Sequence, residues 1–254
     1  MFIRELGAGP AVVVLLHGAP SPAEDFNDLA NELAHRYRVL VPDLPGYGQS
    51  PAGDLSYAAV NQRLRDELAA RSIDRVHALV GFSGGVLRAL YLMLRAGLDC
   101  GVLVSLAGLA GLDAEGRAAM KGFADLARAD PAILSSPAML ELMGNRMLSP
   151  AWRARHPEDV ARVAAWCRLM TPRDLADELD ATSTAEDLHT ELANVSARIY
   201  ARVGELDQAC PLVLSQALVH GVASARLDVV PGCGHALLIE DAAATQRAVV
   251  QAIG

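Results

Sequence analysis

The chain has 254 residues, with 22 Lys and Arg against 30 Asp and Glu, a formal net charge of −8, and 52% hydrophobic residues. This length and composition are typical of one globular domain with a sizeable core. The acidic balance disfavours phosphate backbones and anionic lipid, so we expect neither nucleic acid nor a membrane as a partner. The first apolar run, residues 11–16, is too short for a signal-peptide core or a membrane span, so we expect a cytoplasmic protein.

Short runs rich in β-branched residues alternate with segments of helical period along much of the chain. The candidate strands are 12–16, 37–42, 76–80, 101–106, 197–203 and 225–230, with 2–6 as a further edge strand. The helical segments between the early strands are 23–35, 56–72 and 84–97. Apolar runs without strict alternation, separated by helices, indicate an α/β fold with a mostly parallel central sheet flanked by helices.

One connection is much longer than a crossover requires. No convincing strand occurs between Leu106 and Ala197, whereas a parallel crossover needs only about a dozen residues. Helical segments fill this stretch at 114–129, 137–148 and 157–170, and a further helix begins at 171–172, where Thr can cap and Pro fits the first turn. We therefore expect a core formed by 1–112 and 191–254, with a helical cap inserted at 113–190.

The segment Gly81-Phe82-Ser83-Gly84-Gly85 follows a predicted strand and opens a predicted helix. This is the context of the G-x-S-x-G turn, which exposes a serine hydroxyl at the edge of a sheet. Glycine at 81 and 85 relieves the crowding between strand and helix around such a turn. The alternative is a glycine-rich helix start in which Ser83 is only an N-cap. As a nucleophile, Ser83 would have the Gly84 N–H placed to stabilise an oxyanion.

A serine nucleophile needs a base and an acid that orients the base. His235 follows the last predicted strand and Asp207 follows the penultimate one, so both belong at the same sheet edge as Ser83. We predict a Ser83–Asp207–His235 triad, with Asp113 and Glu205 as weaker candidates for the acid. His17 is a weaker candidate for the base, and we expect it instead to be a structural residue packed near the oxyanion turn. We expect the other histidines to be structural or solvated; they are His35, His77, His156, His189 and His220.

With these motifs in order, the chain resembles the α/β-hydrolase superfamily along its whole length. The resemblance rests on "HGAP" (17–20), "DLPGYGQSP" (43–51), "GFSGG" (81–85), "GELDQACP" (204–211) and "GCGH" (232–235). It implies a second oxyanion donor at the Ala19 N–H and a structural role for Asp43. Serine at the turn differs from the aspartate of haloalkane dehalogenases and epoxide hydrolases. Gly84 stands where similar esterases and lactonases usually carry Met, and where proline iminopeptidases tend to carry Trp.

These features predict a serine hydrolase that cleaves a carboxylic ester or lactone through an acyl-enzyme, with no metal or organic cofactor. The same triad serves carbon–carbon bond hydrolases, thioesterases and acyltransferases, and some members of the superfamily bind ligands without turnover. The sequence leaves the substrate and the oligomeric state open. The four cysteines show no metal-ligand spacing, and we expect free thiols at Cys210 and Cys233.

Candidate substrate-contacting residues lie beside the serine and in the predicted cap. Phe82 either shapes the pocket or fills space beneath the turn. Met139, Met143 and Met147 recur at helical spacing, and this stripe either packs the cap onto the core or lines an apolar acyl site. Six arginines give the predicted cap a basic character, and we expect most of them to be solvated, although one could meet a carboxylate on the substrate; they are Arg146, Arg153, Arg155, Arg162, Arg168 and Arg173.

Overall fold

The computed structural model describes all residues 1–254, and its centre is a seven-stranded sheet in the order β1-β3-β2-β4-β5-β6-β7. The strands are β1 (Ile3–Leu6), β2 (Val12–Leu16), β3 (Arg38–Pro42), β4 (Arg75–Phe82), β5 (Asp99–Leu106), β6 (Arg198–Gly204) and β7 (Ala225–Val230). Only β1 is antiparallel to its neighbour, and every other pair is parallel. The α/β class, the mostly parallel sheet and the edge position of the first strand are thus confirmed.

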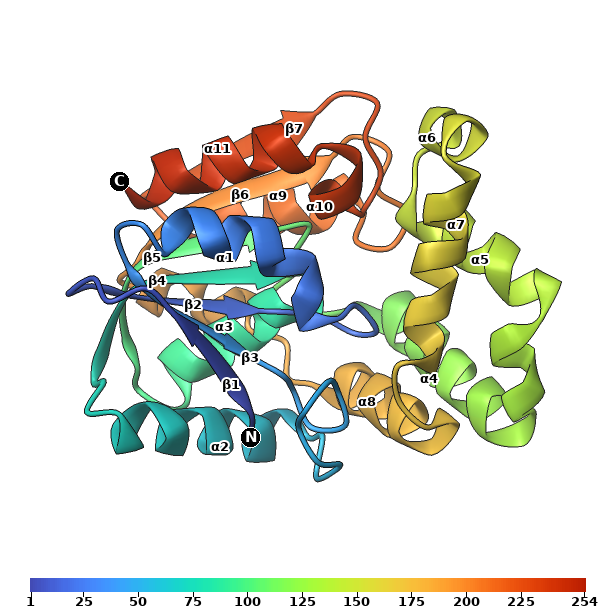
Figure 1. Cartoon of the computed structure of the whole chain (residues 1–254), viewed down its shortest axis with the longest axis horizontal. Coiled ribbons are helices and arrows are strands. Elements are labelled where there is room, and N and C mark those ends of the chain that lie inside the picture. The colour runs from blue at the N-terminus through green and yellow to red at the C-terminus, as the bar shows by residue number, and fades with distance from the viewer.

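Helices cover both faces of the sheet (Figure 1). The helices α1 (Asn27–Leu33) and α11 (Ala242–Ile253) pack on one face, where their buried side chains form a cluster with alternate strand residues. The opposite face is covered by α2 (Tyr57–Ala70), α3 (Gly84–Leu94) and α9 (Leu212–His220), whose buried side chains belong to a second, larger cluster. Because β2, β4 and β5 are covered on both sides, their central residues are uniformly apolar and buried.

The long connection between β5 and β6 is helical throughout, apart from turns and short links. It contains α4 (Ala114–Ala129), η2 (Pro131–Ser135), α5 (Pro137–Met147), α6 (Pro150–Arg155), α7 (Pro157–Ala165), η3 (Trp166–Arg168), α8 (Pro172–Thr184) and η4 (His189–Asn194). In Figure 1 the helices α4 to α8 gather beyond the ends of the strands, on the side to which the arrowheads of β2 and β4 point. The helices between β5 and β6 therefore lie beside the carboxyl ends of the strands.

The helix expected at 157–170 is shorter than its period suggested. It ends at Ala165 and continues as the 3-10 turn η3, and the short helix α6 precedes it. The start at Thr171 is confirmed, since its side chain accepts a hydrogen bond from the Asp174 N–H. Other short elements are η1 (Ala23–Phe26), which leads into α1, and α10 (Leu237–Glu240), which leads into α11.

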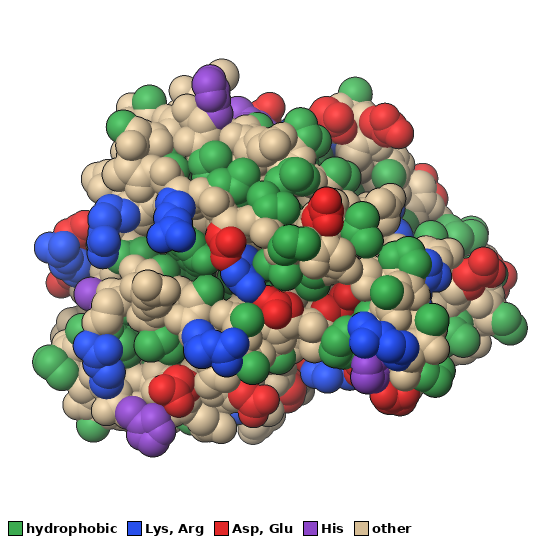
Figure 2. All heavy atoms as spheres, turned by 90° about the horizontal axis from the view of Figure 1, so that it is seen from above, with side chains coloured by type: hydrophobic (Ala, Val, Ile, Leu, Met, Phe, Trp, Pro, Cys, Tyr) green, Lys and Arg blue, Asp and Glu red, His purple; other side chains and the backbone are tan.

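Charged side chains of both signs are mixed on the face of the molecule that Figure 2 shows. Apolar side chains are interspersed among them. None of the helices is both long and apolar enough to cross a lipid bilayer.

Candidate active site

Ser83 lies in the turn between β4 and α3 with an unusual backbone conformation. Its φ is 53° and its ψ is −124°, in a region that side-chain-bearing residues rarely occupy. The side chain makes no capping hydrogen bond to α3, so Ser83 is not a conventional N-cap. A neighbouring strand holds the turn instead, because the Ser83 N–H donates to the carbonyl of Leu106 in β5 at 2.9 Å.

Glycines around this turn are required by close backbone contacts. A Cβ at Gly81 would lie 2.6 Å from the Val86 nitrogen, and a Cβ at Gly85 would lie 2.1 Å from the Leu16 carbonyl oxygen. Both distances are far below van der Waals contact, so any side chain would push α3 away from the sheet. The crowding predicted for positions 81 and 85 is confirmed.

Gly84 differs from these two glycines because it has free space. A Cβ there would meet only the Tyr57 hydroxyl, at an ordinary contact distance of 3.5 Å. The missing side chain therefore leaves room in front of Ser83 rather than preventing a clash.

Asp207 and His235 lie on the loops that follow β6 and β7. His235 Nδ1 donates a hydrogen bond to Asp207 Oδ2 at 2.8 Å, and both residues are buried. The other oxygen, Asp207 Oδ1, accepts from the backbone N–H groups of Ala209 at 2.9 Å and Cys210 at 2.7 Å. These contacts fix the carboxylate, which in turn fixes the imidazole tautomer with its proton on Nδ1.

The Ser83 hydroxyl points toward a thiol in this structure. Its Oγ lies 3.8 Å from Cys210 Sγ, and the structure contains no hydrogen bond between Ser83 and His235. The rings of His235 and Phe82 are nevertheless in contact, with centroids 4.9 Å apart. His235 therefore packs against the residue that precedes Ser83.

Two backbone N–H groups border the same space. Neither Ala19 nor Gly84 donates its N–H among the hydrogen bonds of loops and helix caps. Gly84 is the first residue of α3, where an N–H has no partner within the helix. The two loops are close together, because a Cβ on Gly18 would lie 2.8 Å from the Gly84 nitrogen. Free donors from both loops thus converge beside Ser83.

The competing acids have other roles. Asp113 caps α4 by accepting a hydrogen bond from the Gly116 N–H at 2.8 Å. Glu205 accepts from the Gly232 N–H at 2.8 Å and is exposed. Neither contacts His235.

The competing histidines also lie in other surroundings. His17 Nε2 accepts from the Leu44 N–H at 3.1 Å, and burial lowers the pKa of its imidazole to about 4. This is the structural position expected for His17. The others bond to backbone or surface acids or are exposed, namely His77, His156, His189, His35 and His220.

A cavity of about 80 Å³ lies in front of Ser83 between the sheet edge and the insertion. The core contributes Ala19, Pro20, Ser83, Gly84, Leu109, Leu112, Ala209 and Cys210. The inserted helices contribute Met120 and Phe123 from α4, Met143, Arg146 and Met147 from α5, and Leu179 and Thr182 from α8. Most of these side chains are apolar, so the cavity suits a hydrocarbon group next to the serine.

Two of the candidates for substrate contact do not line this cavity. Phe82 points to the opposite face of the sheet, where strand alternation places it with Ala78 and Val80 in the smaller cluster. Met139 is buried in the larger cluster, one helical turn before Met143. The sequence did not predict that α4 and α8 line the cavity. The spacing of apolar residues along a helix shows which face is buried, but not against which part of the protein.

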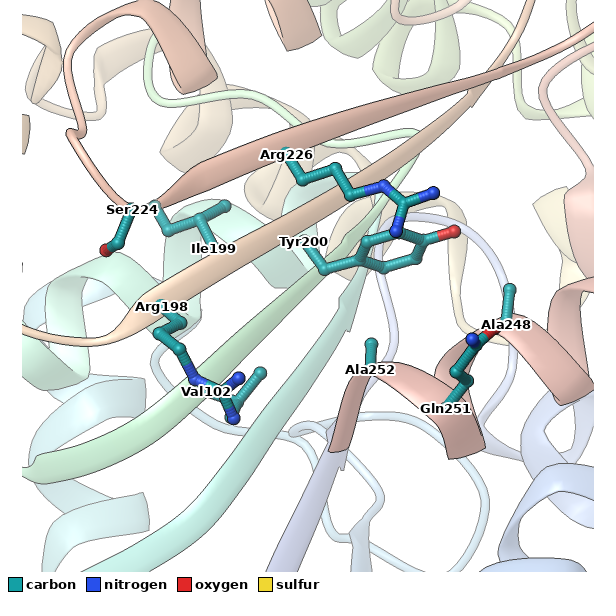
Figure 3. A pocket seen from close by; sticks show the side chains of 9 residues that line it. All are labelled: Val102, Arg198, Ile199, Tyr200, Ser224, Arg226, Ala248, Gln251 and Ala252. Atoms are coloured by element: carbon teal, nitrogen blue, oxygen red, sulfur yellow. The ribbon is translucent and has the colours of Figure 1, made fainter. Parts of the chain in front are cut away.

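A larger pocket lies elsewhere and is separate from this site. Its volume is about 280 Å³, and it is formed by the first residues of β6 and β7 together with the end of α11 (Figure 3). Arg226 lies over the ring of Tyr200 there. Ser83 follows the last residue of β4, whereas this pocket lies at the first residues of β6 and β7, so the two are at opposite ends of the parallel strands.

All four cysteines, including Cys210 and Cys233, are free thiols, as expected.

Comparison with known families identifies the fold. Residues 13–248 match the model described as the alpha/beta hydrolase family. The chain belongs to the alpha/beta hydrolase family. The structure of this alpha/beta hydrolase is similar to that of a thermophilic esterase from Thermogutta terrifontis, with a TM-score of 0.86 and 22% identity, covering 98% of this chain and 91% of the other. It is also similar to the enol-lactonase of Burkholderia xenovorans, with a TM-score of 0.85 and 20% identity, covering 98% of this chain and 95% of the other.

Sequence relatives of this alpha/beta hydrolase include proteins with different names. An uncharacterized protein of Mycobacterium tuberculosis is 38% identical over 110 residues, which cover 42% of this chain and 32% of that protein. The chain thus matches only about a third of the length of that relative. The 2-hydroxy-6-oxo-6-phenylhexa-2,4-dienoate hydrolase of Burkholderia cepacia is 28% identical over 264 residues, covering 96% of this chain and 88% of that protein. The Burkholderia cepacia relative, together with the family match, supports a hydrolase.

Proposed function

We propose that the protein is a serine hydrolase that cleaves a carboxylic ester or lactone through an acyl-enzyme intermediate. The observation that carries the proposal is the meeting of strained Ser83 with the hydrogen-bonded pair Asp207–His235 at one sheet edge. The strained turn holds a hydroxyl at the cavity wall, and the buried pair supplies an oriented imidazole. A nucleophile, a base and an acid in these relations define acyl transfer.

In the first half-reaction, the Ser83 hydroxyl turns from Cys210 toward His235 Nε2, a rotation about one side-chain bond. Oγ attacks the carbonyl carbon while Nε2 takes its proton, and Asp207 stabilises the resulting imidazolium. The carbonyl oxygen becomes an oxyanion that accepts hydrogen bonds from the N–H groups of Ala19 and Gly84. Removing a donor of this kind costs about 3–4 kcal/mol of transition-state stabilisation.

The intermediate then collapses. Nε2 returns the proton to the leaving oxygen, the carbon–oxygen bond breaks, and the acyl group remains on Ser83. In the second half-reaction water attacks the acyl carbon while His235 takes a proton from the water. Collapse releases the carboxylic acid and restores the Ser83 hydroxyl. The residues named here need no metal or organic cofactor for these steps.

The inserted helices, residues 113–190, act in this proposal as a cap that encloses the acyl group. Three of them, α4, α5 and α8, contribute side chains to the cavity wall. The cap excludes bulk water from the reacting carbonyl and strengthens the oxyanion contacts.

Covalent labelling with a fluorophosphonate tests the nucleophile. We expect the wild-type protein to be labelled at Ser83 and the Ser83→Ala variant to remain unlabelled with unchanged circular dichroism. Labelling of Ser83→Ala would place the nucleophile elsewhere.

A matched pair of variants tests the acid. Asp207→Asn should reduce kcat on p-nitrophenyl esters by orders of magnitude, because the imidazole loses its orienting acceptor. Asp113→Asn should leave kcat unchanged, since asparagine also caps helices well. The reverse ranking would overturn the assignment of Asp207.

The relative from Burkholderia cepacia favours a second candidate, hydrolysis of a carbon–carbon bond by the same residues. Its name describes a dienoate hydrolase, and its match extends over nearly the whole of this chain. Turnover of a 2-hydroxy-6-oxodienoate, with no turnover of esters or lactones, would select this candidate.

A further inference from the structure

One charged side chain lines the cavity in front of Ser83, and it is Arg146 of α5. The other lining residues are apolar or uncharged. Arg146 is half-buried and makes no hydrogen bond or ion pair, although an arginine carries five donors. A cation without a partner in an apolar cavity is poorly solvated on that side, so it favours an anion there.

The other cap arginines are not placed in this way. Each of them bonds to or forms an ion pair with another protein group: Arg117 with the Leu112, Ser183 and Ala185 carbonyls, Arg128 with Asp177 and Asp180, Arg153 with Asn145, Arg155 with the Ala151 carbonyl, Arg162 with Asp25, Arg168 with the Leu134 carbonyl and Arg173 with Asp177. Of the eight arginines in residues 113–190, Arg146 alone lines the cavity and has no hydrogen bond or ion pair.

The position of Arg146 is tied to that of the nucleophile. Met143 and Met147 of the same helix face also line the cavity, so α5 presents this face to Ser83. Burial raises the pKa of the Cys210 thiol to about 12, and the positive charge of Arg146 acts against that rise. The guanidinium thus acts electrostatically on Cys210, whose sulfur lies 3.8 Å from Ser83 Oγ.

Arg146 also borders a groove on the outside of the protein. Two acidic residues, Asp113 and Glu115, line that groove with it. Asp113 is engaged at the N-terminus of α4, and neither acid forms an ion pair with Arg146. The guanidinium therefore lies between the cavity and solvent, at the outer end of the cavity.

In the proposed reaction, the cavity accommodates the acyl part of the substrate rather than the leaving group. Ala19 and Gly84, which face the carbonyl oxygen in the proposed reaction, line the cavity, whereas His235 does not. Because His235 returns the proton to the leaving oxygen, that oxygen departs on the side away from these lining residues. A group that reaches Arg146 through the cavity is therefore attached to the carbonyl carbon.

We propose that Arg146 binds a carboxylate at the far end of the acyl chain, so that the preferred substrates are monoanionic esters or lactones of dicarboxylic acids. This inference rests on the proposed serine hydrolase function. The apolar wall contacts the hydrocarbon of the chain, and the guanidinium fork matches a carboxylate in two parallel hydrogen bonds. The local cation also offsets the repulsion of an anion by a chain of net charge −8.

The test compares two p-nitrophenyl esters of adipic acid, one with a free distal carboxylate (mono-p-nitrophenyl adipate) and one in which a methyl ester removes that charge (methyl p-nitrophenyl adipate). We expect the wild-type protein to have a higher kcat/KM for the monoanion, and we expect this preference to shrink as salt is added. Arg146→Gln should lower kcat/KM for the monoanion about 10- to 100-fold and change that for the diester little.

Arg173→Gln is the matched control, because it removes the same charge from an exposed position on the cap. It should leave both substrates unaffected. A wild-type protein without preference for the monoanion would overturn the inference, as would an equal loss on both substrates in Arg146→Gln. A preference for an ester that carries its carboxylate on the alcohol portion would overturn the placement on the acyl side.

A binding measurement separates this inference from the proposed reaction. The monoamide of adipic acid carries the same carboxylate but no ester, and its binding is measured by calorimetry. Binding that Arg146→Gln abolishes supports the carboxylate site even in a protein that hydrolyses no ester. Turnover of neutral esters without any binding of the monoamide would retain the reaction and overturn the site.

Discussion

The backbone carbonyl of Met147 accepts a hydrogen bond from the Ala236 N–H at 2.9 Å. Met147 is the last residue of α5, and Ala236 directly follows His235. The helix that lines the cavity is therefore attached to the loop that carries the proposed base. A displacement of α5 would therefore be transmitted directly to this loop.

Glu240 strengthens the same connection, and its replacement gives the first prediction. Its carboxylate accepts from the Ser149 N–H at 2.9 Å, the Ser149 hydroxyl at 2.5 Å and the Gly234 N–H at 3.1 Å. Glu240→Ala should lower the free energy of unfolding by about 1.5–3 kcal/mol, since these donors bond to a charged acceptor. It should also lower kcat by loosening the His235 loop. Urea unfolding and ester hydrolysis measure the two effects.

Glu141→Ala is the control for that variant, because Glu141 is exposed on α5 and makes no such contacts. It should change neither stability nor kcat by much. If Glu240→Ala changes stability and kcat as little as Glu141→Ala does, the connection between α5 and the loop contributes to neither.

The second prediction tests whether the methionine stripe of α5 lines the acyl site or only packs the inserted helices onto the core. Met143 lines the cavity and Met139 does not. Met143→Trp should shorten the preferred acyl chain on a series of neutral p-nitrophenyl esters, because each excluded methylene forfeits up to about 0.8 kcal/mol of burial. Met139→Trp should lower the melting temperature and leave the preferred chain length in place. An unchanged preference in Met143→Trp would remove α5 from the acyl site.

The sheet and the Ser83 turn could be predicted because local chemistry determines them. Uniformly apolar strands need cover on both faces, and the close contacts at Gly81 and Gly85 exclude any side chain. The loops of Asp207 and His235 follow from the parallel arrangement, which brings the carboxyl ends of β4, β6 and β7 to one edge. These relations need only strand order and direction.

The cavity wall could not be predicted in the same way. Whether Met139 or Met143 reaches the cavity depends on how α5 is tilted over the sheet edge, which the period of the helix does not specify. Selecting Arg146 among eight arginines required knowing the partners of the other seven, several of which lie far away in sequence. By contrast, the orientation of Phe82 away from the cavity could have been predicted, because strand alternation places it on the same face of the sheet as Ala78 and Val80.

The third prediction concerns acid stability and His17. Burial holds the pKa of its imidazole at about 4 in the folded chain, against 6.5 for an ordinary histidine in water. The unfolded chain therefore takes up a proton on His17 at a higher pH than the folded chain does. The free energy of unfolding should fall by about 3 kcal/mol as the pH drops from 6.5 to 4. His17→Gln keeps an acceptor for the Leu44 N–H and removes the titration. The difference between the two proteins in urea unfolding at several pH values isolates this contribution.

The stability that depends on a neutral His17 is fully present above pH 6.5 and is lost as the pH falls toward 4. The wild-type and His17→Gln curves should thus have different slopes in this window. Parallel curves would show that His17 titrates normally in the folded chain.

Intact-protein mass spectrometry of a rapidly quenched turnover mixture tests the central claim most directly. During hydrolysis of a p-nitrophenyl ester, the account predicts a protein species heavier by the acyl group, with the added mass on the peptide that contains Ser83. The same mixture made with Ser83→Ala should show no such species. Turnover without an acylated protein, or an acyl group carried by a residue other than Ser83, would contradict the account.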